Sequence, residues 1–276
     1  MTSTTTRGAE AGLDQAAWRP DPLRRVCSRP LPGLGDTTPA RVLCRQLTFS
    51  SRRDVRSIEG LEHVALGRDP FIFVLNHSTK LETMFLPPLL IYLRDGYRIR
   101  FMADWNFQLV PGVGLIMRSG GVITVCKKPA RPRILNVFKR FYEHDKPSAD
   151  RAREVLDGGE SVGIFREGRV DRDPEAVLPG PPGAARLSLE SGFPIVPAGI
   201  RFPNLPPGRP NSSRYGMSLH IGPAMMPPSE PGRRASRGDV RAWHETIMRA
   251  IGHLSGKAWT PRKPSGASAV RTHADP

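Results

Sequence analysis

The sequence predicts an α/β protein with a mixed, largely parallel sheet flanked by helices. Three observations lead to this fold class. Short apolar runs alternate along the chain with segments whose apolar residues recur at helical spacing. Several of these runs end abruptly on polar or charged residues, as buried strands do at the edge of a sheet. The length of 276 residues is sufficient for one sizeable core. Alternating elements of this kind are typical of a sheet covered by helices.

Six segments have the composition of strands. Each is a short run dominated by β-branched and other apolar residues, and glycine, proline or charged residues stand at its ends. We expect strands over residues 71–75, 98–102, 121–125, 162–165, 195–200 and 218–221.

Four segments have the pattern of helices. The first has apolar residues at helical spacing at Ile134, Leu135, Val137, Phe138, Phe141 and Tyr142. The second is capped by Ser148 and runs to Leu156, with Gly158-Gly159 closing it. The third covers residues 183–190 and is ended by Gly192. The last has a single apolar stripe, more typical of core contact than of a membrane anchor, made by Val240, Trp243, Ile247, Ile251 and Leu254.

Composition divides the chain into three parts. Residues 1–45 are rich in Thr, Gly, Pro and Arg without sustained periodicity, and we expect a loosely ordered N-terminal extension. Residues 46–255 contain all the predicted strands and helices and form the expected central domain. Residues 256–276 repeat the composition of the beginning and are expected to be a disordered tail.

The chain is strongly basic. It has 41 Lys and Arg against 26 Asp and Glu, a formal charge of +15. This surplus favours anionic partners, namely phospholipid head groups, coenzyme A phosphates, acidic carrier proteins or nucleic acid, although a generally basic surface explains it equally well. Basic and aromatic residues are not interleaved as in proteins that bind single strands, so we expect no nucleic acid partner.

The cysteines and the apolar runs bear on location. Cys27, Cys44 and Cys126 have no metal-ligand spacing, and their odd number fits free thiols in a reducing cytoplasm. The first residues are polar and lack the apolar centre of a signal peptide. The longest apolar run, 84–93, is interrupted by two prolines and is about half the length of a membrane-spanning helix. If the protein meets a membrane, we expect it to lie on the surface.

Asn76-His77-Ser78-Thr79-Lys80-Leu81-Glu82 contains the main candidate for catalysis. His77 follows an apolar strand, and Glu82 comes five residues later, within reach if a helix begins there. A carboxylate on one imidazole nitrogen fixes the tautomer and leaves the other nitrogen basic, which is a minimal general-base device. Alone, this pattern is weak, because His77 also fits an ordinary loop position and Glu82 an ordinary first-turn helix residue.

Two later strands end on charged residues. The strand over residues 121–125 is followed by Lys127 and Lys128, which fit either a phosphate site or a solvated basic turn. The strand over residues 162–165 is followed by Arg166-Glu167-Gly168-Arg169. This group fits a surface salt-bridge cluster or a site where Arg clamps an anion and Glu accepts a hydroxyl hydrogen bond. Its position favours a binding site, since α/β sheets bind ligands at this edge.

Together with Phe193-Pro194-Ile195-Val196-Pro197, which composition alone assigns to the core, these segments resemble the glycerolipid acyltransferase family. That family has an N-H-x-x-x-x-D block, a G-x-I-x-V-x-R block, an F-P-E-G-T-R block and a V/I-P-I-V-P block. The corresponding segments here are residues 76–82, 121–127, 165–170 and 193–197. The resemblance covers about residues 55 to 225, and the order and intervals of the blocks are similar. It implies a glycerolipid acyltransferase-like fold and an acyltransferase domain at 46–255.

The resemblance implies transfer of a fatty acyl group from a thioester to a hydroxyl of a lysophospholipid such as 1-acylglycerol-3-phosphate, in phospholipid biosynthesis. His77 would be the general base and Glu82 would orient it. Substrate binding is assigned to Asn76, Lys127, Lys128, Glu167, Gly168 and Arg169. Acyl-CoA or acyl carrier protein would be the co-substrate, with no further cofactor, no metal and no covalent enzyme intermediate.

The blocks depart from the family at several positions. Glu82 replaces an Asp, and Lys127 replaces an Arg that would bind the substrate phosphate. Arg166 and Arg169 replace Pro and Thr, and Val170 occupies the usual Arg position, so that Arg169 takes that role one residue early. These changes bear on the acceptor more than on the reaction. Two alternatives therefore remain, an O-acyltransferase for another acceptor (a lyso-aminolipid or a specialised metabolite) and a non-catalytic lipid-binding relative.

Location follows from the same comparison. A basic protein acting on lipids is expected to be cytoplasmic and peripheral at the inner face of the cell membrane, bound to an anionic membrane surface. Residues 84–90 would help form an acyl groove, enter the interface or belong to the core, and the core is the simplest of these interpretations.

Overall fold

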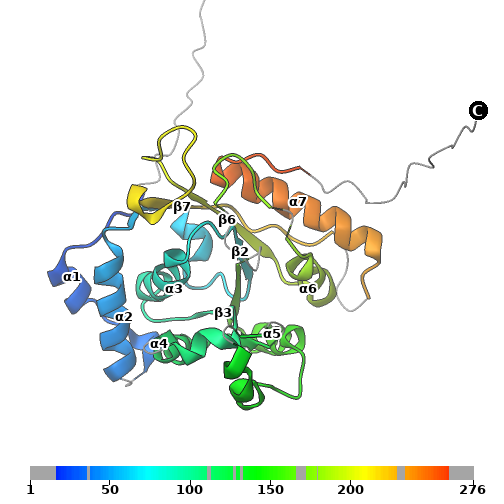
Figure 1. Ribbon diagram of the computed structural model, residues 1–276, viewed down its shortest axis with the longest axis horizontal. Coiled ribbons are helices and arrows are strands. Elements are labelled where there is room, and N and C mark those ends of the chain that lie inside the picture. The colour runs from blue at the N-terminus through cyan, green and yellow to red at the C-terminus, as the bar shows by residue number, and fades with distance from the viewer. Residues whose placement is uncertain are drawn as a thin grey trace, which may run out of the picture.

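A computed structural model describes residues 17–35, 38–110, 113–126, 129–130, 133–165, 172–178, 180–228 and 234–260 (Figure 1). Its centre is one seven-stranded sheet with strand order β1-β7-β6-β2-β5-β3-β4. Five of the six strand pairs are parallel, and only β6 and β7 run antiparallel. The strands are β1 Val55–Glu59, β2 Ile72–Leu75, β3 Ile99–Asp104, β4 Ile123–Val125, β5 Ser161–Phe165, β6 Ile195–Arg201 and β7 Met217–Ile221. The predicted mixed, largely parallel sheet is confirmed.

Helices cover both faces of this sheet (Figure 1). The α-helices are α1 Leu23–Ser28, α2 Thr38–Ser51, α3 Leu81–Leu93, α4 Val113–Ser119, α5 Ser148–Asp157, α6 Gly183–Ser191 and α7 Arg237–Ser255. The 3-10 helices are η1 Pro32–Leu34, η2 Leu61–Val64, η3 Trp105–Leu109, η4 Arg133–Phe141 and η5 Ser213–Tyr215. Within the described residues, no helix has the length and apolar character needed to cross a bilayer.

The central strand β2 divides the core into two halves. Successive side chains of a strand point to opposite faces, so Phe73 and Leu75 pack on one side and Ile72 and Val74 on the other. The first side is shared with α2 and α3, and the second with α5, α6 and α7. All four β2 side chains are buried, which explains why this strand is a continuous apolar run in the sequence.

β1 is a strand that the sequence analysis did not predict. It lies at one end of the strand order and pairs only with β7 among the named strands. Val55 and Ile58 are its buried side chains, and Arg56 and Glu59 are exposed. An edge strand with so few apolar residues gives almost no periodic signal.

The segment before residue 45 is more ordered than the sequence analysis expected. In its described part, α1 and the beginning of α2 are helical, and Trp18 pairs with Ile58 through two backbone hydrogen bonds of 2.8 and 3.0 Å. The core includes four of its side chains, Val26, Leu31, Leu34 and Cys44. These four buried side chains are scattered among polar residues and have no regular spacing. The composition of the segment therefore resembles that of a loosely ordered extension. The domain boundary at residue 46 stays a prediction.

The end of the chain also differs from the expected tail. Residues 261–276 lie outside the described residues, but residues 256–260 pack against the domain. Gly256 ends α7 with a φ of 67°, and Lys257 is only 9% exposed. Ala258 forms a backbone bridge with Ala176. Five residues assigned to a tail therefore belong to the folded domain.

The predicted helices are present with three corrections. Residues 133–141 form the 3-10 helix η4 rather than an α-helix, and none of their side chains is buried. Ser148 is the first residue of α5 rather than its cap, because Pro147 occupies the cap position. The stripe on α7 is buried as expected except for Leu254, which is half-buried. α6 ends at Gly192, whose φ of 80° is the left-handed conformation expected of a closing glycine.

Residues 84–90 belong to α3. The helix continues through Pro87 and Pro88, and the side chains of Leu86, Leu89 and Leu90 are completely buried in the core. The core interpretation is therefore correct for these leucines, which leaves them unable to face a bilayer.

Close packing of α7 against β6 makes Gly199 a sensitive position. A Cβ there would lie 2.2 Å from the Ser255 nitrogen and 2.3 Å from the Leu254 carbonyl carbon, and both are backbone atoms. We expect Gly199→Ala to lower the free energy of unfolding by about 3 kcal/mol, because α7 must shift to admit the methyl group. Urea denaturation measures this change.

The matched control is Gly183→Ala at the start of α6, where an added Cβ meets no atom within 4 Å. We expect that variant to stay within about 1 kcal/mol of the wild type, since Ala is the better helix former. Equal losses in the two variants would contradict the packing argument.

Candidate active site

The loop after β2 places His77 at the carboxyl edge of the sheet. β2 lies between β6 and β5 and is parallel to both, so the ends of these three strands meet at one edge. This is the edge where open α/β sheets hold their ligands. α3 begins four residues after His77 and returns over the sheet, which brings Glu82 back toward the strand end.

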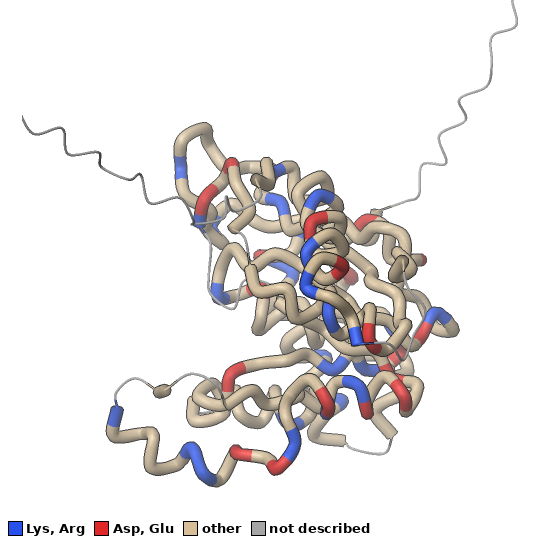
Figure 2. The backbone as a smooth tube through the Cα atoms, turned by 90° about the vertical axis from the view of Figure 1, so that its right-hand side faces the viewer, with Lys and Arg blue, Asp and Glu red and all other residues tan. Residues whose placement is uncertain are grey.

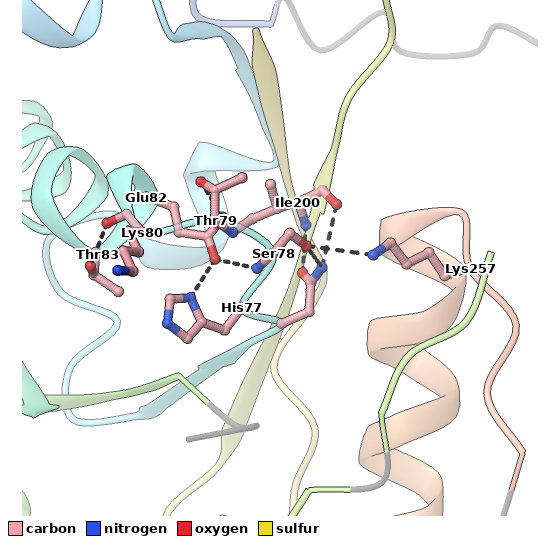
Figure 3. A network of polar contacts seen from close by, with 9 residues as sticks. His77, Ser78, Thr79, Lys80, Glu82, Thr83, Ile200 and Lys257 are labelled. Carbon is pink, nitrogen blue, oxygen red and sulfur yellow. Dashed lines mark hydrogen bonds and ion pairs between the residues drawn. The ribbon is translucent and has the colours of Figure 1, made fainter. Parts of the chain in front are cut away.

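His77 and Glu82 are in direct contact, as the sequence spacing predicts (Figure 3). The distance from Nδ1 of His77 to Oε1 of Glu82 is 2.6 Å. The Glu82 side chain is fully buried, whereas 13% of the His77 side chain is exposed. The carboxylate therefore engages Nδ1 from within the protein, and Nε2 is the nitrogen available to a substrate.

Two backbone groups complete the environment of the Glu82 carboxylate. The N–H of Ser78 donates to Oε1, and the N–H of Thr79 donates to Oε2 over 2.9 Å. The Thr79 hydroxyl lies 3.3 Å from Oε2. Burial raises the pKa of the Glu82 carboxyl, and the hydrogen bonds from His77 and the backbone lower it less than burial raises it. The acid is longer than the family's Asp, but it still reaches the imidazole.

The Asn76 side chain is buried and makes hydrogen bonds within the protein. Its Oδ1 accepts a hydrogen bond of 2.7 Å from the Ile200 N–H, and its Nδ2 donates to the Ser78 hydroxyl over 3.1 Å. The residue is 1% exposed. The sequence assigned substrate binding to Asn76, whereas these contacts tie the loop of His77 to the end of β6.

An aromatic ring from the next strand lies against His77. Phe165, the last residue of β5, has its ring centroid 5.3 Å from that of the imidazole, at an interplanar angle of 49°. Phe165 pairs with Leu75 in the sheet, and its ring also contacts Phe101 on β3 at 5.3 Å. The beginning of the third sequence block is thus next to His77.

The other predicted substrate-binding residues lie outside the described residues. They are Lys127, Lys128, Glu167, Gly168 and Arg169. The strands that precede them, β4 and β5, are parallel to β2 and end at the same edge of the sheet. The roles of these five residues stay predictions.

Lys257 contacts this site and was not found by sequence reasoning. Its Nζ is 3.5 Å from the Ser78 hydroxyl (Figure 3). The same Nζ donates to the Asp173 carbonyl oxygen over 2.6 Å. It follows α7, whose end is held by hydrogen bonds from Arg201 to the Leu254 and His253 carbonyls. No motif points to it, since 179 residues separate it from Ser78.

A second histidine–carboxylate pair lies elsewhere on the sheet. His220 Nδ1 is 2.9 Å from Glu59 Oε2, and its Nε2 is 3.1 Å from the Ser218 hydroxyl. Burial and the nearby Arg201 lower the pKa of His220. These residues line a cavity of about 490 Å³ that also includes Lys257. Glu59 is half exposed, so this pair lacks the buried orienting acid of His77.

The pKa of Glu82 gives a prediction about stability and pH. The pKa of glutamate in the unfolded chain is about 4.3, and burial raises the pKa of the Glu82 carboxyl in the folded protein. Stability therefore falls as the pH rises from the unfolded pKa through the folded pKa. Glu82→Gln removes this ionisation. We expect the free energy of unfolding of the variant, minus that of the wild type, to become more positive from about pH 4 to about pH 8 in urea denaturation.

Glu190→Gln, on α6, is the control for replacing a helical carboxylate by an amide. A Glu82→Gln difference that stays constant or becomes more negative over this range would show that burial does not dominate the ionisation of Glu82.

Comparisons with known proteins agree with the fold and with the resemblance to an acyltransferase family. The family model described as Acyltransferase matches residues 52–201, more than half of the chain. A search of curated proteins gives no match. Among solved structures, the chain is similar to the crystal structure of the 1-acyl-sn-glycerophosphate (LPA) acyltransferase PlsC from Thermotoga maritima, with a TM-score of 0.51 and 18% identity over 80% of this chain and 81% of that one. The fold is therefore that of PlsC, and the chain belongs to the acyltransferase family.

Proposed function

We propose that this acyltransferase moves a fatty acyl group from an acyl thioester to a hydroxyl of a lysophospholipid such as 1-acylglycerol-3-phosphate, as a step of phospholipid biosynthesis. The main supporting observation is the 2.6 Å contact between His77 Nδ1 and the buried Glu82 carboxylate. Membership of the acyltransferase family and the likeness to an LPA acyltransferase support the same reaction.

The proposed chemistry uses His77 twice. Nε2 accepts the proton of the acceptor hydroxyl while its oxygen attacks the thioester carbonyl carbon, which forms the new C–O bond. The tetrahedral intermediate then breaks its C–S bond, and the imidazolium returns the proton to the leaving thiolate. The products are an ester and a free thiol. General-base assistance of this kind contributes about 10²–10⁴ in rate.

Glu82 stabilises the imidazolium formed in the first step. Its carboxylate holds Nδ1–H, so the ring presents Nε2 in the orientation that the hydroxyl needs. The Ser78 and Thr79 N–H groups fix the carboxylate in turn. In this proposal Asn76 is a positioning residue, because its amide ties the loop to Ile200.

The acceptor is assigned through the family blocks. Glu167 and the backbone of Gly168 hold its glycerol-like end, and Lys127, Lys128 and Arg169 face its phosphate. Acyl-CoA or acyl carrier protein supplies the acyl group, and the enzyme acts peripherally at the inner face of the cell membrane. Positive charge supports binding of each of these anionic partners.

The direct test incubates purified protein with acyl-CoA and a panel of lysophospholipids, and measures free thiol and lipid product. We expect His77→Ala to lower kcat by about 10²–10⁴, because general-base assistance is lost. His220→Asn is the matched control, since His220 also contacts a carboxylate but lines a cavity that does not include His77. Full activity of His77→Ala, or a loss only in His220→Asn, would refute the assignment of the base.

A second test concerns the phosphate of the acceptor. We expect Lys127→Ala to raise KM about tenfold for phosphate-bearing acceptors and to leave KM unchanged for acceptors without phosphate, because one ammonium contact is lost. Lys146→Ala is the control, since Lys146 is exposed and pairs with Glu154. An equal rise of KM for both classes of acceptor would assign Lys127 a role unrelated to the phosphate.

A further inference from the structure

One stretch of the chain exposes an unusual share of the protein's large apolar side chains. Twelve such side chains are exposed in the described residues, and seven of them lie between residues 107 and 141. We call these seven the apolar face. They are Phe107 and Val110 near η3, Leu115 on α4, and Ile134, Val137, Phe138 and Phe141 on η4. Soluble monomers rarely gather exposed apolar residues in this way unless the surface binds something.

η4 is the part of this face with the least packing against the rest of the protein. It is a nine-residue 3-10 helix without a buried residue, although runs of this kind rarely exceed about four residues. Its four large apolar side chains on the face are between 45% and 79% exposed. The periodicity that predicts an amphipathic helix is present, but the apolar side does not face the core.

η3, α4 and η4 are connected by contacts. The ring of Trp105, at the start of η3, stacks 5.8 Å from that of Tyr142, which follows η4. The Cys126 thiol, after β4, donates to the Tyr142 carbonyl over 3.0 Å. The Gly114 N–H of α4 donates to Val110 over 3.2 Å, next to η3. Figure 1 shows α4 and the green segment before α5 along the same side of the molecule.

The face lies at the edge of the sheet that contains His77. η3 follows directly on the carboxyl end of β3, and η4 comes eight residues after the carboxyl end of β4. Both strands are parallel to β5, which is parallel to β2. A surface bound to this face would therefore adjoin the edge at which the candidate histidine stands.

The same segment is rich in positively charged residues. Residues 105–147 contain eight Lys and Arg but only two Asp and Glu. Among the described ones, Arg118, Arg133 and Arg140 are exposed, and Lys139 pairs with Glu143 at 3.4 Å. On α7, by contrast, Arg residues alternate with acids (Figure 2), and Glu245 pairs with both Arg241 and Arg249. The unbalanced charge accompanies the apolar face.

We propose that the apolar face docks the enzyme on an anionic lipid bilayer. Apolar side chains flanked by Lys and Arg are the composition of a segment that lies in the membrane interface, where the rings enter the acyl boundary and the cations meet anionic head groups. The proposal deepens the proposed function, because an acceptor lipid would pass from the bilayer to His77 along one edge of the sheet. It replaces the leucines of α3, which are buried, as the membrane-contacting segment.

The test is sedimentation with two kinds of vesicle, phosphatidylcholine alone and phosphatidylcholine mixed with an equal part of phosphatidylglycerol. We expect the wild type to bind the mixed vesicles and the double variant Phe138→Ser/Phe141→Ser to bind them at least tenfold more weakly. The matched control is Leu66→Ser/Met226→Ser, because Leu66 and Met226 (44% and 66% exposed) are as accessible as Phe138 and Phe141 (45% and 65%) but lie outside the face.

Three outcomes overturn the proposal. The first is equal vesicle binding by the wild type and the Phe138→Ser/Phe141→Ser variant. The second is an equal loss of binding in the Leu66→Ser/Met226→Ser control. The third is a wild-type dimer in light scattering that the Phe138→Ser/Phe141→Ser variant breaks, which would assign the face to a second copy of the chain.

An assay with acyl-CoA and a short-chain, monomeric lysophospholipid separates docking from catalysis. We expect the Phe138→Ser/Phe141→Ser variant to retain wild-type turnover there. Vesicle binding without any wild-type turnover would refute the proposed function and leave the docking face in place.

Discussion

The geometry of this site depends on one buried carboxylate. Glu82 has no exposed surface, and its oxygens accept hydrogen bonds from the His77 ring and from the N–H groups of Ser78 and Thr79. A buried charge without partners would cost several kcal/mol, so the turn between β2 and α3 is stable only in the conformation that supplies these donors. The same interaction thus closes the turn, starts α3 and orients the imidazole.

Elements other than α3 also hold this turn. Asn76 fixes its beginning to Ile200 on β6, Phe165 on β5 lies against the imidazole, and Lys257 reaches Ser78 from the end of α7. These contacts come from three separate parts of the chain. The histidine is therefore positioned by the assembled sheet as well as by its own loop, which is the rigid support that precise proton transfer needs.

The sequence was sufficient where burial produces a continuous pattern. β2 and its neighbours are buried on both faces and appear as uninterrupted apolar runs, and the His77–Glu82 contact follows from a spacing of five residues. β1 was missed because only Val55 and Ile58 are buried, and α1 because its anchors are scattered. Periodicity also cannot tell whether a core lies opposite an apolar stripe, so η4 was predicted as an ordinary helix. Lys257 has no local signal at all.

The place of Lys257 has a consequence for how such enzymes diverge. The family match ends at residue 201, yet a residue 56 positions later contacts the turn that presents the histidine. Substitutions after β7 can therefore alter the position of the candidate catalytic histidine without changing any motif residue. Two relatives with identical motifs can differ in reactivity because their C-terminal helices end differently, and motif comparison alone would not detect the difference.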